Sequence, residues 1–331
     1  MYNAFIIYLV ITFLLLISFA IISYKLNLVD IPSKRKMHDK PTAYTAGLAI
    51  SLAYLCSLKL IGFGSNNLSL IISIAFLISI IGLIDDKYNL SAGSKLSLQI
   101  VPIFYLIVIE NMNLTQIGDY NYFKLELNTF AIPFTLISVL FLINAFNYFD
   151  GIDGSLSFTF ISVIAILFFL THDDDIKIFL IIILLPVCIF LFFNFSLFNL
   201  PKLFLGDSGS LLLGFIASFV LIFYQNQELA HPILLAWSIA IFVYEFLSVN
   251  LERVKNKNDP FKAGLDHLHH MLLKKNNSIF LTNFLLFIIN ITLFITGYLI
   301  FKFIGPLASL IIFIIFFIIF FILRNKYLVK N

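Results

Sequence analysis

Long apolar runs alternate with short polar segments along almost the whole chain. Eleven runs come close to the roughly 20 residues that a helix needs to cross a hydrocarbon core about 30 Å thick. They cover residues 4–24, 46–63, 68–84, 96–110, 130–147, 156–171, 176–194, 209–225, 230–250, 279–300 and 305–323. The pattern predicts an all-α, polytopic integral membrane protein with about 11 transmembrane helices. We detect no internal repeat and no soluble domain, and therefore expect one membrane-embedded domain over residues 1–331.

The basic residues predict how these helices are oriented. With the N-terminus outside, the cytoplasmic segments are 25–45, 85–95, 148–155, 195–208, 251–278 and the tail from 324, and they hold 17 of the 21 Lys and Arg residues. Cytoplasmic loops of membrane proteins are enriched in Lys and Arg, so this division predicts an N-out, C-in topology. The first run has no basic residue before it and is too long for the apolar core of a signal peptide, so we interpret it as a retained helix.

Composition narrows the class further. The chain is 61% hydrophobic and 12% charged, and its formal net charge of +3 is too small to indicate a nucleic-acid partner. Cys56 and Cys188 both fall inside apolar runs, which favours buried thiols over a disulfide framework. We therefore expect a multi-pass protein of the inner (plasma) membrane.

Five polar clusters interrupt the apolar runs, and the predicted topology places all of them on the cytoplasmic side. They are "DIPSKRKMHDK" (30–40), "IDDKYNLSAGSK" (84–95), "NAFNYFDGIDGS" (144–155), "LFLGDSGS" (203–210) and "DHLHH" (266–270). The topology was derived from Lys and Arg alone, so the gathering of Asp, Asn and His on one face is an independent result. It predicts a cytoplasmic active site.

Each cluster also has a purely structural interpretation. Asp85 and Asp86 would end a helix at the water, and Asp207 or Ser208 would accept free N–H groups at the start of a helix. The "HLHH" sequence would suit zinc, although three histidines within four residues do not easily reach one tetrahedral ion and no cysteine accompanies them.

The segment 144–155 is the hardest to explain as structure alone, because a turn needs only one Asn or Asp and one Gly. Four such side chains recur here at steps of three. Asn144 and Asn147 would share a helix face, and Asp150 and Asp153 would continue round that face or leave the helix through the adjoining glycines.

The clusters together indicate phosphate chemistry. Aspartates gathered on one face need a cation among them, and hard oxygen ligands suit Mg²⁺, which usually also binds substrate phosphates. The cationic segments 33–40 and 251–275 would receive the remaining phosphate charge. A water-soluble nucleotide and a lipid phosphate would be able to meet at such a site.

Four of the clusters also carry a resemblance to a known family. "DDKYNLSAGSKLSLQ", "NAFNYFDGIDG", "FLGDSGS" and "NDPFKAGLDHLHHML" resemble, in order, the signatures of the polyprenyl-phosphate N-acetylhexosamine-1-phosphate transferases of glycosyltransferase family 4. "RKMHDKPTAYTAG" resembles their first cytoplasmic loop, and the likeness covers about residues 25–275. The resemblance implies ten or eleven helices with a cytoplasmic active site.

The histidine motif points to a branch of that family. "HLHH" after "NDPF" is similar to the branch that uses UDP-N-acetylglucosamine or related UDP-sugars. The branch acting on UDP-N-acetylmuramoyl-pentapeptide has a differently spaced histidine motif and is kept as an alternative. The chain departs from the usual pattern at Ala46-Gly47, where two glycines are usual, at Glu245, where Asp is usual, and in "KAGLDHLHH", which lacks an arginine near the histidines.

The reaction implied by the resemblance is transfer of a sugar 1-phosphate from a UDP-sugar to polyprenyl (undecaprenyl) phosphate, which releases UMP and initiates a cell-envelope glycan. The cofactor would be Mg²⁺, with Mn²⁺ as a substitute, and a homodimer is left open. By motif matching, Asp207 and Asn147 are metal ligands, and Asp85 is a base or positions the lipid phosphate, with Asp86 as its neighbour. The substrate-binding residues implied are Lys95, Asn144, Asp150, Asp153, His267, His269 and His270.

Two other classes remain open on the residues alone. A cation-coupled secondary transporter would have as many helices, but its carboxylates should lie near the bilayer midplane, whereas these lie at helix ends. A lipid-phosphate hydrolase would release inorganic phosphate and would need no UDP-sugar.

Overall fold

The computed structural model describes residues 2–32, 39–257, 259, 264 and 266–330. The cationic segment 33–40 therefore lies mostly outside the described residues, as do Lys262 and most of the "NDPFKAGL" stretch. Two compact units are formed. The first comprises residues 1–105 and 172–220, and the second comprises residues 106–171 and 221–331.

Every one of the eleven predicted segments coincides with a helix or with two consecutive helices. Among the described residues, eight helices are long and apolar enough to cross a membrane, and the bent pair α9 and α10 makes up to nine. Two further apolar helices, α2 (Ala46–Leu60) and α6 (Ser155–Leu170), are shorter than that criterion. The protein is thus a helical, multi-pass membrane protein, while the count of 11 spans and the N-out orientation stay predictions.

The first unit is built from long helices and one small hairpin. Its elements are α1 (Tyr2–Lys25), β1 (Val29–Asp30), β2 (Thr42–Ala43), α2, α3 (Asn66–Tyr88), α4 (Ala92–Phe104), α7 (Asp174–Asn194), η3 (Leu197–Asn199) and α8 (Gly206–Asn226) up to Val220. Helix α2 packs against α1, α3 and α7, and the buried hydroxyl groups of Tyr8 and Tyr54 donate to main-chain carbonyls of α7. These bonds satisfy tyrosine hydroxyls that would otherwise be buried without a partner.

The start of α8 fits tightly among its neighbours in this unit. Gly82 of α3 lies against the main chain of Asp207, where a Cβ atom would stand 2.4 Å from the carbonyl oxygen. Gly47 of α2 lies against Gly209 in the same way, with 2.1 Å from a Cβ to the amide nitrogen. Of the Ala46-Gly47 pair, where the family usually has two glycines, Gly47 is the residue at which α2 contacts α8. Ala43 pairs with Leu203, which joins the hairpin to the segment before α8.

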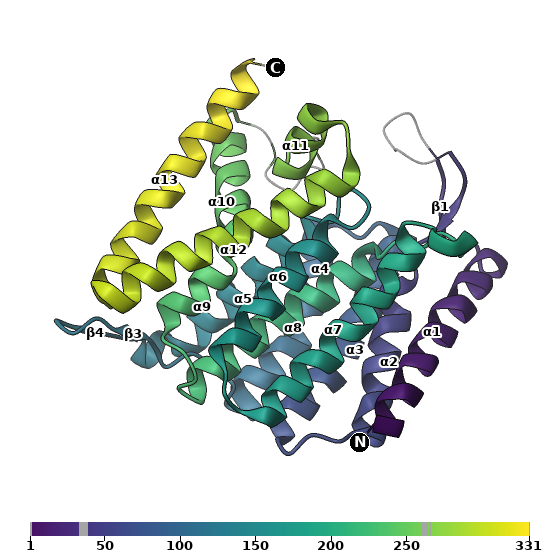
Figure 1. The fold of residues 1–331 in the computed structure, drawn as a ribbon, viewed down its shortest axis with the longest axis horizontal. Coiled ribbons are helices and arrows are strands. Elements are labelled where there is room, and N and C mark those ends of the chain that lie inside the picture. Colours follow the sequence, from purple (N-terminus) through teal and green to yellow (C-terminus); the bar gives the residue numbers. More distant parts are fainter. Residues whose placement is uncertain (1, 33–38, 258, 260–263, 265, 331) are drawn as a thin grey trace. The chain divides into compact units, whose positions relative to one another are not determined.

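The second unit contains the C-terminal helices shown in yellow-green and yellow in Figure 1. Its elements are η1 (Tyr105–Ile109), β3 (Gln116–Asp119), β4 (Lys124–Glu126), η2 (Asn128–Phe130), α5 (Ala131–Asn147), α6, the end of α8, α9 (Pro232–Ser238), α10 (Ala240–Lys255), α11 (Leu268–Asn276), α12 (Ile279–Phe303) and α13 (Pro306–Lys330). Helix α12 packs against α6, α9, α11 and α13, and Trp237 of α9 is fully buried among them.

Helices α9 and α10 form a broken span, bent by 71°. The break frees main-chain groups, which are costly to bury without partners. Asn290 of α12 compensates, because its Nδ2 donates to the Ser238 carbonyl (2.9 Å) and to the Ser162 hydroxyl (2.8 Å). A buried amide thus holds the bend in place.

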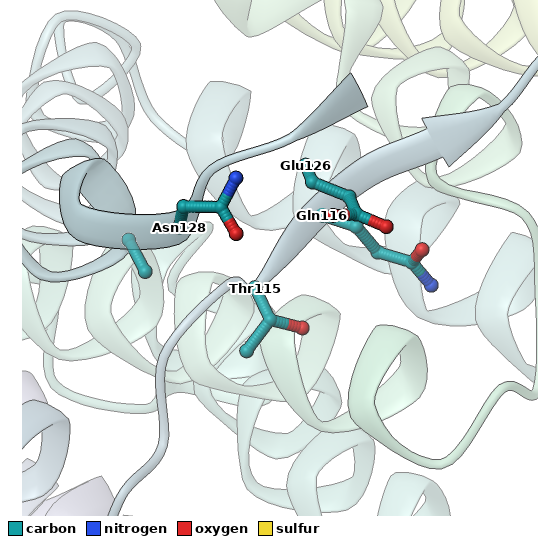
Figure 2. Close-up of a pocket in the computed structure, with 5 residues that line it drawn as sticks. Thr115, Gln116, Glu126 and Asn128 are labelled. Atoms are coloured by element: carbon teal, nitrogen blue, oxygen red, sulfur yellow. The ribbon is translucent and has the colours of Figure 1, made fainter. Parts of the chain in front are cut away.

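A small polar pocket lies beside the β3–β4 hairpin (Figure 2). It is lined by Thr115, Gln116, Glu126, Asn128 and Ala131. None of the residues predicted to act in catalysis or binding lines this pocket, so it is not the predicted active site.

Candidate active site

The first unit gathers three of the predicted residues around one ammonium group. Lys95 Nζ lies 2.7 Å from Asp85 Oδ2 and 2.5 Å from Asp207 Oδ2. Asp85 lies in the last turn of α3, Lys95 lies in the first turn of α4, and Asp207 lies in the first turn of α8. Residues more than 100 positions apart in the chain therefore form one charged cluster, the Asp85–Lys95–Asp207 cluster.

Local structure explains how Asp85 and Lys95 are aimed at each other. Helix α3 ends at Asn89, which adopts a left-handed conformation (φ 49°) suited to a helix C-cap. The chain then reverses, Leu90 N–H donates to Asp85 Oδ1 (2.9 Å), and Ser91 caps α4 by accepting from Ser94 N–H. One carboxylate oxygen of Asp85 is thus held by the main chain, and the other faces Lys95.

Asp86 has a different environment from Asp85. Its two oxygens accept the N–H groups of Asp207 (3.0 Å) and Ser208 (3.3 Å). A carboxylate at this place caps α8 and is favoured by the helix dipole. Gly206 is needed there, because a Cβ would stand 2.7 Å from Asp86 Oδ2 and because its φ is +69°. The "GDSGS" segment is therefore a capped helix start, but the carboxylate that caps these N–H groups is that of Asp86 rather than a side chain of Asp207 or Ser208.

The donor set of this cluster fits magnesium better than zinc. Asp85 and Asp207 offer hard carboxylate oxygens around one point of positive charge, which Lys95 occupies. Across the described residues, no three His, Cys, Asp or Glu side chains lie close enough to hold a metal ion. Mg²⁺ commonly uses only one or two carboxylates, completed by water and substrate phosphates.

The second unit brings the "NAFNYFDGIDGS" and "HLHH" segments together. Helix α5 ends at Asn147, and the chain leaves the helix through a turn that reaches α6 at Gly154 (φ 78°). Asn144 and Asn147 therefore lie on the last turn of α5, whereas Asp150 and Asp153 lie in the turn. Of the two arrangements that the sequence left open, the break through the glycines is the one found.

Gly151 is the point at which this turn meets the histidines. A Cβ at Gly151 would lie 2.1 Å from His269 Nε2 and 3.0 Å from His270 Nε2. His269 is fully buried, and neither of its ring nitrogens has a hydrogen-bond partner among the described residues. The rings of His267 and His269 are nearly parallel, with centroids 5.6 Å apart, and the His270 ring centroid lies 4.3 Å from that of His269.

The environment keeps two of these histidines neutral. Burial lowers the pKa of His270 to about 4, with the nearby His267 as a second cause. Burial also holds the pKa of His269 well below its ordinary value, helped by both neighbouring histidines. At neutral pH each of these two imidazoles therefore offers one N–H donor rather than two.

The histidine segment depends on charges that the sequence did not single out. Arg253 donates to both oxygens of Asp266, from Nε (3.1 Å) and Nη2 (2.8 Å), and lies over the Tyr148 ring. Its charge is thus committed to Asp266 rather than exposed for a nucleotide. Burial by itself would raise the pKa of Asp266, but its hydrogen bonds and the charges of Arg253 and His267 lower it overall.

Arg253 also changes the interpretation of this loop. An arginine does reach the residue before the histidines, although none stands next to them in the sequence. The signal was the "LERVK" run at 251–255, which the sequence indicates only as part of the cationic segment 251–275. Lys255, Lys257, Lys274 and Lys275 remain exposed, as expected of a cationic loop.

The sequence of this chain is similar to those of known transferases, and the similarity includes the charged residues of the Asp85–Lys95–Asp207 cluster. The model of glycosyl transferase family 4 matches residues 68–225, which include the whole Asp85–Lys95–Asp207 cluster and the 144–155 segment. The chain is 29% identical over 259 residues to the "Probable undecaprenyl-phosphate N-acetylglucosaminyl 1-phosphate transferase" of Bacillus subtilis (strain 168). It is 25% identical over 261 residues to the undecaprenyl-phosphate alpha-N-acetylglucosaminyl 1-phosphate transferases of Escherichia coli (strain K12) and Yersinia pestis. Each match covers 76% of this chain and 71% of the relative.

The helical membrane fold and these matches together indicate a membrane-embedded transferase. Residues 68–225 are similar to glycosyl transferase family 4, and the matches together indicate an enzyme of the glycosyl-1-phosphate transferase class.

Proposed function

We propose that the protein transfers N-acetylhexosamine 1-phosphate from a UDP-sugar to undecaprenyl phosphate, with Mg²⁺ as cofactor and on the cytoplasmic side of the membrane. An oxygen of the lipid phosphate attacks the sugar-bearing phosphorus, the bond from that phosphorus to the UMP oxygen breaks, and UMP leaves. The names of the relatives support the lipid acceptor and the sugar 1-phosphate.

The observation that carries this proposal is the Asp85–Lys95–Asp207 cluster. A phosphate monoester has a second pKa near 6, so the lipid phosphate is already mostly ionised at neutral pH. The main difficulty is to bring one polyanion onto another, which charge neutralisation and alignment address. The cluster offers a fixed ammonium and two carboxylate groups within 2.7 Å of it.

The residues of the cluster then have distinct roles. Asp207 would hold Mg²⁺ together with substrate oxygens, and the metal would supply positive charge to the diphosphate. Lys95 is placed to bind a phosphate oxygen and to keep the two carboxylates from repelling each other. Asp85, fixed by Leu90 N–H, orients Lys95 or the lipid phosphate. The part of Asn147 in metal binding stays a prediction, as do the substrate contacts of Asn144, Asp150 and Asp153.

The test is a reconstituted assay. Purified protein is mixed with undecaprenyl phosphate, MgCl₂ and a panel of UDP-sugars that includes UDP-N-acetylglucosamine and UDP-N-acetylmuramoyl-pentapeptide, and UMP is followed. We expect UMP release that needs the lipid phosphate and stops on chelation with EDTA. Release of inorganic phosphate without a UDP-sugar would instead indicate a hydrolase, and turnover of the pentapeptide substrate alone would place the chain in the other branch.

A further inference from the structure

Glu245 is the buried centre of a network in the second unit. It is fully buried in α10, and each of its carboxylate oxygens has a partner. Oε1 accepts the main-chain N–H of Leu268 (2.9 Å), and Oε2 accepts Arg324 Nε (3.2 Å). Leu268 is the first residue of α11, so Glu245 satisfies one of the N–H groups that a helix start leaves without a partner.

Arg324 extends the network from α13. Its side chain is 1% exposed, and its three nitrogens reach three separate acceptors. Nε donates to Glu245, Nη1 donates to Glu252 Oε2 (2.5 Å), and Nη2 donates to the main-chain carbonyl of Asp266. The planar guanidinium fork makes such a set possible, whereas the ammonium of a lysine is a single point.

The contacts converge on the residues that flank His267. Arg324 holds the carbonyl of Asp266, Glu245 holds the N–H of Leu268, and Arg253 holds the Asp266 carboxylate. His267 Nδ1 itself lies 3.6 Å from Glu245 Oε1, and its ring packs edge-on against Tyr148. The main chain on both sides of His267 is thus fixed by buried charges.

A bridge that only packed α13 against α10 would need Glu245 and Glu252 but no bonds to the main chain at 266 and 268. The desolvation of a buried ion pair often cancels its attraction, so stability alone is a weak reason for it. Two of the contacts, from Glu245 to the N–H of Leu268 and from Arg324 to the carbonyl of Asp266, instead bind the main chain of the histidine segment. The network therefore serves the placement of that segment.

We propose that Arg324 is a positioning residue that, through Glu245 and the Asp266 carbonyl, fixes His267 and the start of α11 in the geometry that receives the UDP-sugar. This inference rests on the proposed function. It also explains why Glu245 can replace the usual Asp, because the longer side chain spans from the N–H of α11 to the guanidinium on α13.

The first test measures local order and does not depend on activity. Amide hydrogen exchange is followed at residues 266–271 in the wild type, Arg324→Met, Arg324→Lys and the control Lys326→Met, which removes an exposed charge from the same helix. We expect exchange in this segment to be at least about tenfold faster in Arg324→Met, since bonds to charged groups are lost. Arg324→Lys should be intermediate, and Lys326→Met should match the wild type.

A second variant guards against failure to fold, because Arg324→Met leaves Glu245 buried without its counter-charge. In the double variant Glu245→Gln with Arg324→Met both buried charges are removed, which is often neutral for stability. The carboxamide oxygen introduced by Glu245→Gln can still accept from Leu268 N–H, but the bond to the Asp266 carbonyl is gone. We expect this variant to melt close to the wild type and still to exchange faster at 266–271.

The second test uses kinetics. We expect the KM for the UDP-sugar to rise at least about tenfold in the double variant, the scale of one lost charged hydrogen bond, while the KM for undecaprenyl phosphate changes much less. If amide exchange at residues 266–271 in the variants is as slow as in the wild type, the positioning role is wrong. It is also wrong if exchange is faster but the KM for the UDP-sugar does not change. If the wild type itself releases no UMP, the proposed function fails, and the exchange rates still decide whether Arg324 orders the segment.

Discussion

Neighbouring acids in the sequence have separate tasks at the scale of single residues. Asp85 faces the ammonium of Lys95, whereas Asp86 turns to the N–H groups that start α8. The "DD" pair alone did not distinguish these tasks, because a helix rotates successive side chains by about 100° and both interpretations fit a helix end. The partner of Asp86 lies 121 positions away, which no local pattern reveals.

Substitution of the two carboxylates in the cluster should separate charge binding from proton transfer. We expect Asp207→Asn to lose most UMP release at every pH, because a neutral carboxamide cannot offset diphosphate charge. Asp85→Asn should show a deficit that does not shrink as pH rises, because the lipid phosphate is already ionised. Initial rates between about pH 6 and 9 measure both.

A deficit of Asp85→Asn that is confined to low pH would instead show that Asp85 is a base, since alkali would replace it. Asp174→Asn, at an exposed acid, is the control.

His270 predicts how stability depends on pH. Its pKa is held at about 4 in the folded protein, below the ordinary value of about 6.5. Between these values the unfolded chain binds a proton that the folded chain does not, so proton binding favours the unfolded state. The stability that His270 contributes is therefore fully present above about pH 6.5 and is lost as pH falls toward 4. We expect a lower melting temperature at pH 5 than at pH 7.5.

The variant His270→Asn should reduce that difference in melting temperature. It should not abolish the difference, because burial shifts His269 in the same direction. Substitution of the exposed His172 by Asn should leave the difference as it is. A full difference retained in His270→Asn would contradict the assignment.

At the scale of elements, hydropathy located the long helices because each is an unbroken apolar run. It missed α11, whose nine residues include two histidines and two lysines and form no apolar run. It also missed the bend between α9 and α10, because a run from 230 to 250 has the same composition whether straight or broken. The bend depends on Asn290, 52 positions from Ser238. The strands, of two to four residues, are too short for an alternating pattern to be recognised.

Close packing between α3 and α8 gives a prediction for these elements. Gly82→Ala would place a methyl group 2.4 Å from the Asp207 carbonyl oxygen, so α8 and its first-turn carboxylate must shift. We expect a loss of about 1–3 kcal/mol in stability, as for other overpacked cores, together with reduced UMP release.

Gly93→Ala is the matched control, because nothing lies within 4 Å of its Cβ position, and alanine favours a helix over glycine. Thermal unfolding and UMP release of both variants measure the effect. Equal melting of Gly82→Ala and the wild type would show that the two helices have room to separate.

At the scale of the whole molecule, the charge distribution gives a prediction for the topology. The 17 to 4 division of basic residues predicts which loops face the cytoplasm. In a variant without Cys56 and Cys188, single cysteines at the exposed positions Ser91 and Asn256 should be protected from an impermeant external thiol reagent. A cysteine at Asn66, also exposed, should react. Labelling at Ser91 from outside would overturn the assignment of the Asp85–Lys95–Asp207 cluster to the cytoplasmic face.

Sequence reasoning found residue types more readily than partners. It selected Asp85, Lys95 and Asp207 by motif matching, and the structure places their charged groups together, while their roles stay predictions. It counted Arg324 only among the basic residues of the cytoplasmic tail, because basic residues after a long apolar run are typical of a cytoplasmic helix end. Only the packing of α13 against α10 shows that the guanidinium is buried among acids.

The Arg324 network also fixes an order of events during biosynthesis. Arg324 follows Asp266 by 58 positions, with α11, α12 and most of α13 between them. At about 5–20 residues per second, the ribosome reaches Arg324 about 3–12 s after it has made the histidine segment. The segment can be locked only after that interval, once α12 and α13 have entered the bilayer. The nascent enzyme therefore cannot hold its histidines in place until the membrane-insertion machinery has delivered the helix that carries Arg324.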